Sequence, residues 1–262
     1  MSLQVRLEAL AAAIGADIKA LIDPAQAGWG WFIPCDGSNA ITVLGSATPS
    51  STGTLTAAVR AITSKFTRTR RIEYLVTTAA TTAVAGWRIP ANHLVRGNAA
   101  GIGGFYSKQV WGPATGVATA TNRAFVGLSA STSAPTNVEP STALVSCIGM
   151  GWGSADTNVQ LMHSDSSAGS TLVDLGASFL VPTVDRSSMY QIEIWCAPNA
   201  TSLDWKVTNL ISGAVVSGNT GASTDIPANT AYLSERGWMS VGGTSSVIGI
   251  ALFGGRFQAP SW

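Results

Sequence analysis

Charged side chains are scarce in this chain of 262 residues, and the scarcity restricts the partners that it can bind. Asp, Glu, Lys and Arg make up 11% of the sequence, less than half of the roughly 25% of an ordinary soluble domain. The formal net charge is +1, and the longest basic run is the pair Arg70 and Arg71. Because a nucleic-acid backbone is bound through clustered Lys and Arg, we do not expect nucleic acid as a partner. The segment around this pair, KFTRTRRIEY, alternates basic residues with Thr and Phe, and we interpret it as the exposed face of a strand.

Histidine and cysteine are also rare, which argues against metal-dependent chemistry. The two histidines, His93 and His163, stand in no metal-ligand spacing, and we expect no metal and no other cofactor. Cys35, Cys147 and Cys196 are an odd number in apolar surroundings, which favours buried free thiols made in a reducing compartment over a disulfide framework. No window of about twenty residues is apolar and uncharged enough to span a bilayer, so we expect a protein that is not embedded in a membrane.

Catalytic signatures are missing from the sequence as well. Neither a G-x-S-x-G nucleophile elbow nor a phosphate-binding G-x-x-x-x-G-K-[ST] loop occurs. A glycan-cleaving enzyme would need two carboxylates on opposite sides of a sugar bond. We interpret the acidic candidates as structural, because they alternate outward on strands or lie in turn sequences: Glu73, Asp156, Asp165, Asp174, Glu193 and Asp204. We therefore expect no enzyme.

The first twenty-two residues, MSLQVRLEALAAAIGADIKALI, show the pattern of a short coiled coil. Steps of four and three residues, the a/d spacing that turns one helix face towards a partner helix, separate Leu3, Leu7, Leu10, Ile14, Asp17 and Leu21. A helix of about twenty residues is roughly 30 Å long and marginally stable alone in water. We therefore predict a coiled-coil stem at 1–23 that joins several copies. The alternatives are an amphipathic helix packed on its own head and a signal peptide, whose apolar core Glu8 would interrupt.

Beyond the stem, the sequence predicts β structure. Pro24, Gly28, Gly30 and Pro34 forbid a long regular element, and we interpret 24–40 as a neck. In 41–262, short apolar stretches alternate with turn sequences rich in Gly, Pro, Asn and Ser, which indicates an antiparallel sandwich or barrel. The predicted strands are 41–45, 54–62, 70–79, 86–89, 104–112, 123–130, 143–152, 158–165, 171–176, 189–197, 203–210, 214–218, 237–241 and 247–257.

One tryptophan falls on the unexpected face of its predicted strand. Ile192 and Ile194 are expected on the core face of the strand, whereas Trp195 is expected on the opposite face, together with the polar residues Gln191 and Glu193. A large aromatic side chain on the solvent face needs an explanation. Trp195 is expected under a covering loop, between the sheets of neighbouring subunits, or in a binding groove.

Six segments of the chain, taken in their order, carry a resemblance to a known family of proteins. They are NAAGIGGFY, RAFVGLSAST, CIGMGWGSADTNVQLMHSD, LVDLGASF, YQIEIWCAPN and DIPANTAYL. In these segments the chain resembles the C-terminal receptor-binding heads of bacteriophage tail fibres. The stretch VRLEALAAAIGADIKAL resembles the short coiled coil that precedes such heads.

The resemblance implies a homotrimer whose head is a jelly-roll or concanavalin-like β-sandwich. Such a head attaches the virion, without catalysis, to a glycan, lipopolysaccharide or other outer-membrane component of a bacterium. It also implies partners among the phage tail or baseplate proteins, and assembly in the host cytoplasm. The alternatives are a glycan-cleaving tailspike, a purely structural tail subunit, and a secreted bacterial lectin, which would require an export signal.

For contacts with a receptor, the sequence offers residues that combine an aromatic ring or a cation with neighbouring turn residues. These candidates are Trp152, Arg236 and Trp238. Burial in the core is the alternative for the two tryptophans.

Overall fold

The computed structural model describes residues 29–33, 50–57, 60–90, 92–167, 169–222 and 224–259. The predicted stem at 1–23 lies outside these residues, and so do its seam positions Leu3, Leu7, Leu10, Ile14, Asp17 and Leu21. The homotrimer therefore stays a prediction.

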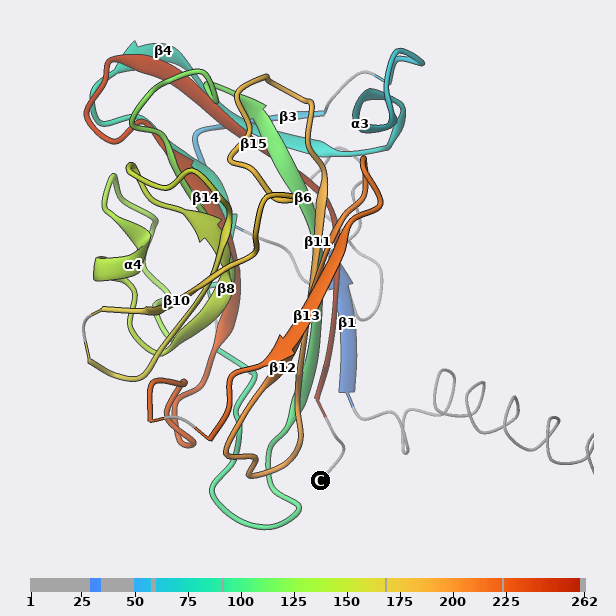
Figure 1. Ribbon diagram of the computed structural model, residues 1–262, viewed down its shortest axis with the longest axis vertical. Coiled ribbons are helices and arrows are strands. Elements are labelled where there is room, and N and C mark those ends of the chain that lie inside the picture. Colours follow the sequence, from blue (N-terminus) through green and yellow to red (C-terminus); the bar gives the residue numbers. More distant parts are fainter. Residues whose placement is uncertain are drawn as a thin grey trace, which may run out of the picture.

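Two antiparallel β-sheets pack face to face in the described part of the chain (Figure 1). Sheet A has the order β13-β12-β11-β6-β15-β4-β3, with β1 also paired to β15, and sheet B has the order β10-β9-β8-β7-β14-β5-β2. The strands of sheet A are β1 (Trp29–Ile33), β3 (Thr54–Ala57), β4 (Ile72–Ala80), β6 (Phe105–Thr115), β11 (Tyr190–Cys196), β12 (Asp204–Asn209), β13 (Val215–Asn219) and β15 (Ser246–Ala259). Those of sheet B are β2 (Ser50–Thr52), β5 (Val84–Arg88), β7 (Arg123–Ser129), β8 (Cys147–Trp152), β9 (Gln160–Ser164), β10 (Thr171–Asp174) and β14 (Ser234–Ser240). The predicted mainly β sandwich is confirmed.

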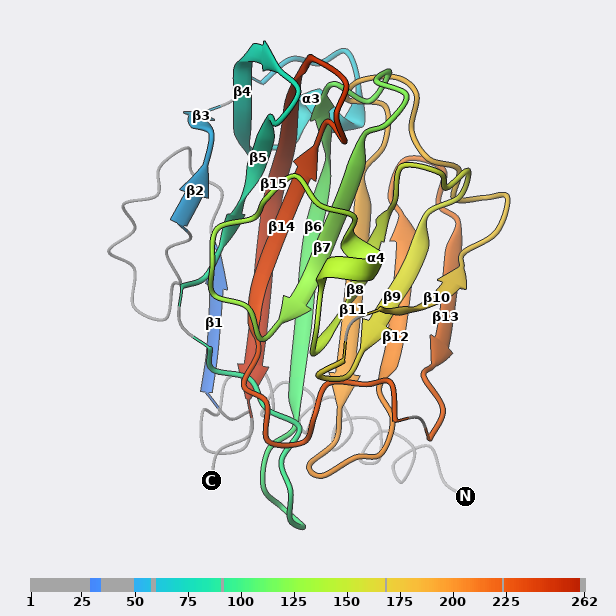
Figure 2. The same ribbon diagram turned by 90° about the vertical axis from the view of Figure 1, so that its left-hand side faces the viewer.

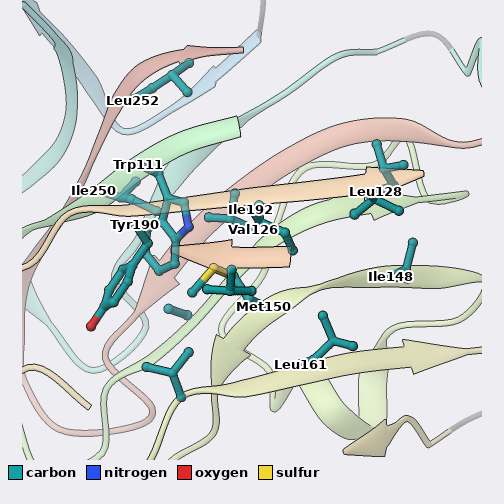
Figure 3. Close-up of a cluster of buried hydrophobic side chains, with 14 of the residues drawn as sticks. Trp111, Val126, Leu128, Ile148, Met150, Leu161, Tyr190, Ile192, Ile250 and Leu252 are labelled. Carbon is teal, nitrogen blue, oxygen red and sulfur yellow. The ribbon is translucent and has the colours of Figure 1, made fainter. Parts of the chain in front are cut away.

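The principal core lies between the two sheets and follows from the two-residue period of the strands. Along β6, side chains alternate between buried and partly exposed from Phe105 to Trp111, as expected for a strand with one face on the core. Trp111 of sheet A stacks on Trp152 of sheet B with ring centroids 5.8 Å apart, and Figure 3 shows aliphatic side chains of both sheets around Trp111. Each fully buried large side chain contributes about 1.5–3 kcal/mol.

A second, smaller core covers the outer face of sheet B. The segment 130–146, here called the strap, runs across this face and contains the short helix α4 (Pro140–Ala143), which lies in front of β7 and β8 in Figure 2. Under the strap, an apolar cluster includes Phe125, Cys147, Met162 and Trp238. The strap explains why every residue of β8, β9 and β14 is buried.

Among the described residues, a four-residue helix, α3 (Lys65–Arg68), covers one end of the outer face of sheet A. Its Phe66 lies against Gly112, where a Cβ atom would be 2.7 Å from the Phe66 ring. The prediction that this basic segment forms a strand face is wrong, because Ser64 and Thr67 close a capping box that starts a helix.

The structure adds a short strand to one predicted segment and shortens another. The neck at 24–40 contains the strand β1, which pairs with the end of β15 from Gly255 to Ala259. The flanking Gly and Pro residues do not prevent this short strand, because β15 extends beyond β4 and offers a free edge. The predicted strand 54–62 begins as β3 but ends at Ala57.

The expectation for the cysteines is confirmed for Cys147 and Cys196, which are free and buried, while Cys35 lies outside the described residues. Within the described ranges, no helix has the length and apolar character needed to cross a membrane.

Candidate functional site

The part of the outer face of sheet A that α3 leaves uncovered carries an exposed aromatic pair. Trp195 of β11 stands opposite Tyr106 of β6 in the antiparallel register, and the two ring centroids are 5.5 Å apart with an interplanar angle of 42°. Trp195 is 36% exposed. We call Tyr106 and Trp195 the aromatic platform. It lies where β6, β11 and β12 run side by side in Figure 1, at the end of β6 opposite to α3.

A hydrogen-bonded carboxylate fixes the position of the platform. The Tyr106 hydroxyl donates to Glu193 Oε1 at 3.0 Å, and Gln191 Nε2 donates to Glu193 Oε2 at 2.8 Å. Lys206 of β12, opposite Glu193 in the register, places Nζ 3.0 Å from the same Oε2. These bonds hold the Tyr106 ring in one orientation, because its hydroxyl has a fixed acceptor.

The ionisation states of this cluster follow from its surroundings. Burial acts to raise the pKa of Glu193, but hydrogen bonds from Lys206, Gln191 and Tyr106 outweigh it, and the pKa lies below its usual value. Burial first, and then the charge of Glu193, raise the pKa of Tyr106. At neutral pH the site therefore holds an ionised carboxylate and a protonated phenol.

Glu193 and Glu73 lie on the outward face of their strands, as predicted, but neighbouring side chains shield both from solvent. Glu193 is 8% exposed and Glu73 only 3%. Arg71 Nε lies 2.7 Å from Glu73 Oε1, and Arg186 Nη2 lies 2.9 Å from Glu73 Oε2. Burial opposes ionisation of Glu73, but the bonds to the two arginines lower its pKa. Glu73 thus joins β4 to the segment that precedes β11.

The candidate carboxylates for glycan cleavage are all held by neighbouring donors. Glu73 and Glu193 are bonded as described, and the partners of Asp156, Asp165, Asp174 and Asp204 are Gly153 N, Ser167 N, Asn158 Nδ2 and Asn219 Nδ2. These bonds agree with structural roles. Within the described ranges, no cluster of His, Cys, Asp and Glu is suited to hold a metal ion.

The two histidines take part in internal contacts. His163 is 2% exposed, and its Nδ1 lies 2.6 Å from the Asp225 carbonyl oxygen, as expected for a hydrogen-bonded core residue. His93 Nε2 lies 2.8 Å from Oε2 of the buried Glu235. Burial raises the pKa of Glu235 more than His93 lowers it.

Depressions also occur elsewhere on the described part of the chain, and the larger of two lies at the opposite end of β6, where Thr115 is. It has a volume of about 650 Å³ and is lined by Thr115, Asp185, Thr244 and neighbouring polar residues. Asp185 is already engaged there, since it accepts hydrogen bonds from Thr115 Oγ1 at 3.0 Å and from Val117 N at 3.1 Å. No aromatic side chain lines this depression, so the platform offers the better apolar contact surface.

The residues proposed from the sequence as receptor contacts are buried. Trp152 is 0% exposed, Trp238 1% and Arg236 3%. Trp152 belongs to the principal core and donates from Nε1 to Asn122 Oδ1 at 2.6 Å. These exposures correct the expectation of surface contacts and favour the alternative of core packing, because none of the three side chains reaches the surface.

Arg236 and Trp238 lie together on β14 beneath the strap, away from Trp152. Arg236 donates to the carbonyl oxygens of Ser131 at 2.8 Å and Ser133 at 3.2 Å, and its guanidinium lies 5.0 Å from the Trp238 ring centroid. Their role in this structure is to hold the strap on sheet B.

Sequence reasoning identified Trp195 by its place in the alternation but missed Tyr106. The signal for Tyr106 was the same outward alternation in GFYSKQVWG, where Tyr106 and Lys108 fall on one face. The sequences of β6 and β11 do not indicate that these two strands are neighbours in the sheet.

Comparisons with known proteins show the fold. No protein-family profile and no characterised protein sequence matches the chain. Among solved structures, lectin II from Ulex europaeus matches with a TM-score of 0.52 and 10% identity, over 89% of this chain and 99% of that one. A protein of unknown function from Shewanella oneidensis matches with a TM-score of 0.51 and 13% identity, over 88% and 86%. The chain therefore has a lectin-like, concanavalin-type sandwich. These comparisons leave the resemblance to tail fibres untested.

Proposed function

We propose that the protein is a carbohydrate-binding attachment head, the receptor-binding end of a bacteriophage tail fibre, which acts as a homotrimer. It binds a glycan or lipopolysaccharide on the bacterial surface and does not cleave it. The observation that carries the proposal is the exposed Trp195 ring beside Tyr106, set in place by Glu193.

The chemistry of the platform suits a pyranose. One face of a sugar ring presents C–H groups that pack on aromatic rings, while its hydroxyls need donors and acceptors around the edge. Trp195 and Tyr106 supply the aromatic surface, and the partly exposed Gln191 and Lys206 supply polar groups beside it. A sugar ring lying on the platform can therefore satisfy its apolar face and its polar rim at once.

The expected affinity of one such site is low. Removing about 100 Å² of apolar surface from water is worth about 2.5 kcal/mol, and one or two hydrogen bonds add about 1 kcal/mol each. A total of about 4 kcal/mol corresponds to a Kd of about 1 mM. Attachment by sites this weak requires several copies acting together, and linking sites raises the overall affinity by about 10²–10⁴. The predicted trimeric stem at 1–23 supplies that linkage.

Cell staining with defined variants tests this function. Labelled protein is expected to stain susceptible bacteria, and extracted lipopolysaccharide or capsule is expected to compete. Trp195→Ala should reduce staining at least tenfold, because the stacking surface is lost, and Trp195→Phe should restore part of it. Tyr232→Ala is the matched control, since Tyr232 is an aromatic residue that is 56% exposed outside the platform, and it should stain normally.

Sedimentation of the same variants separates ligand binding from assembly. Trp195→Ala should keep the mass of the trimer. Dissociation of the oligomer in that variant would instead make the platform an interface between copies. Unchanged staining would remove the platform from the proposal, and release of reducing ends from host polysaccharide would favour the tailspike alternative.

A further inference from the structure

We infer that the platform, acting in the function proposed above, selects acidic glycans through Lys108 and Arg256. The ligand class is a pyranoside that carries a carboxylate or phosphate group, oriented with that group over β6 and β15.

The two cations are direct neighbours on the outer face of sheet A. Arg256 of β15 stands opposite Lys108 of β6, and Lys108 in turn stands opposite Glu193 of β11. Lys108 is two residues from Tyr106 on the outward face of β6. Lys108 and Arg256 therefore lie next to the platform, the first on the same strand as Tyr106 and the second on the neighbouring strand β15. From there they can contact a substituent on a sugar that stacks on the platform.

Both cations are available for a ligand. Glu193, the carboxylate nearest in register, is occupied by Tyr106, Gln191 and Lys206. Within the part of the chain that the structure describes, neither Lys108 nor Arg256 has a side-chain hydrogen bond or a salt bridge. Arg256 is exposed and Lys108 is partly exposed. In a chain with only 15 Lys and Arg residues, two adjacent cations that form no ion pair with any described residue are a local concentration of positive charge.

The charge around the platform is also directional. Asp204 of β12 stands opposite Trp195 on the far side from β6 and accepts a hydrogen bond from Asn219. Negative charge thus lies beyond Trp195, and the unpaired positive charge lies beyond Tyr106. An anionic substituent is repelled at the first position and attracted at the second, which fixes the direction of a bound sugar.

Charge also favours a soluble ligand over a second copy of this chain at this face. The centre of a subunit interface is depleted of charged residues, which are costly to bury without partners. Here Lys108 and Arg256 lie beside the aromatic pair, and an interface centred on this face would bury both cations. A small acidic ligand neutralises them instead.

The test compares one polymer with and without its acidic groups. Acidic capsular polysaccharides are paired with their carboxyl-reduced forms, and lipopolysaccharide is paired with its dephosphorylated form, so that each arm identifies one source of the anion. Binding should fall about tenfold on neutralisation, equivalent to about 1.4 kcal/mol. The preference should shrink in 1 M salt, where the Debye length is about 3 Å, while the remaining contact persists.

Variants assign the preference to the two cations. Lys108→Gln with Arg256→Gln should lose the tenfold preference and keep the binding of the neutralised polymers. Arg60→Gln with Arg68→Gln removes the same charge from two exposed positions, one before α3 and one in it, and should keep the preference. Melting temperatures confirm that both double variants are folded.

The outcomes distinguish the two proposals. Equal binding of acidic and neutralised polymers, with loss of both in Trp195→Ala, overturns the acidic preference and supports the proposed function. Equal loss of preference in both double variants overturns the assignment to Lys108 and Arg256, since net charge alone would then be responsible. Failure to bind any polymer overturns the proposed function, and this inference with it.

Discussion

Replacing Arg236 by methionine should destabilise the fold and leave glycan binding intact. Methionine keeps an apolar stem against Trp238 but removes the guanidinium that bonds to Ser131 and Ser133 of the strap. The expected effect is therefore on the attachment of the strap to sheet B, and the platform on sheet A is unaffected.

The loss of stability expected for Arg236→Met is the difference between two opposing contributions to the free energy of unfolding. Hydrogen bonds that involve a charged group contribute about 1.5–3 kcal/mol each, so the two bonds of Arg236 supply about 3–6 kcal/mol. Against this, burial and the nearby Arg88 lower the pKa of Arg236 to about 10 from 12.5, and at about 1.4 kcal/mol per pKa unit this costs about 3 kcal/mol. The difference between the two terms is a net loss of about 1.5 kcal/mol in the variant, the middle of a range of about 0–3 kcal/mol.

Thermal unfolding followed by circular dichroism measures this loss. For a domain of this size, about 1 kcal/mol shifts Tm by about 2–4 °C, so Arg236→Met should melt about 3–6 °C below the parent protein. Arg68→Met, at an exposed arginine of α3, is the matched control and should melt normally. Cell staining by Arg236→Met below its Tm should equal that of the parent. An unchanged Tm together with lost staining would refute the structural role and return Arg236 to the receptor contacts suggested by the sequence.

Two more predictions concern the core and the platform. Trp111→Ala should lower the free energy of unfolding by about 3–5 kcal/mol, because Trp111 is 0% exposed between the sheets. Urea unfolding measures this loss, and a value below about 1 kcal/mol would contradict the packing described. The folded-state pKa of Glu193 is depressed below its usual value of 4.5, so the stabilising contribution of this carboxylate is present above that pH and disappears as the pH falls through the folded-state pKa. The difference in unfolding free energy between the parent and Glu193→Gln should therefore vanish in acid, and a difference that grows below pH 4.5 would mean that the carboxylate is not stabilised in the folded protein.

Alternation in the sequence located most strands, because side-chain direction in a strand has a period of two residues. It also identified Trp195 as an outward-facing aromatic residue. It misplaced the segment at Lys65, where Thr and basic residues alternate but the capping box of Ser64 and Thr67 produces a helical turn. Local hydrogen bonds, rather than the alternation of side chains, determined the secondary structure of that segment.

The misassigned functional residues have a different origin. Trp152 and Trp238 stand beside turn residues, which made them candidates for loop contacts. Trp152 stacks on Trp111 across the two sheets, and Trp238 packs on Phe125 under the strap, with ring centroids 5.2 Å apart. Whether a residue next to a turn is exposed depends on what covers it, and the covering segment is remote in sequence. The same holds for Glu73, whose partner Arg186 approaches from another part of the chain.

The sequence by itself determined that the described chain is built of strands, which side chains of each strand share a face, and that charged residues are sparse. These properties depend on composition and on the local geometry of the backbone. Only the tertiary structure decided that β6 lies between β11 and β15, which sets Tyr106 beside Trp195 and Lys108 beside Arg256. Strand order depends on pairings between distant segments, and no local pattern specifies which strands become neighbours.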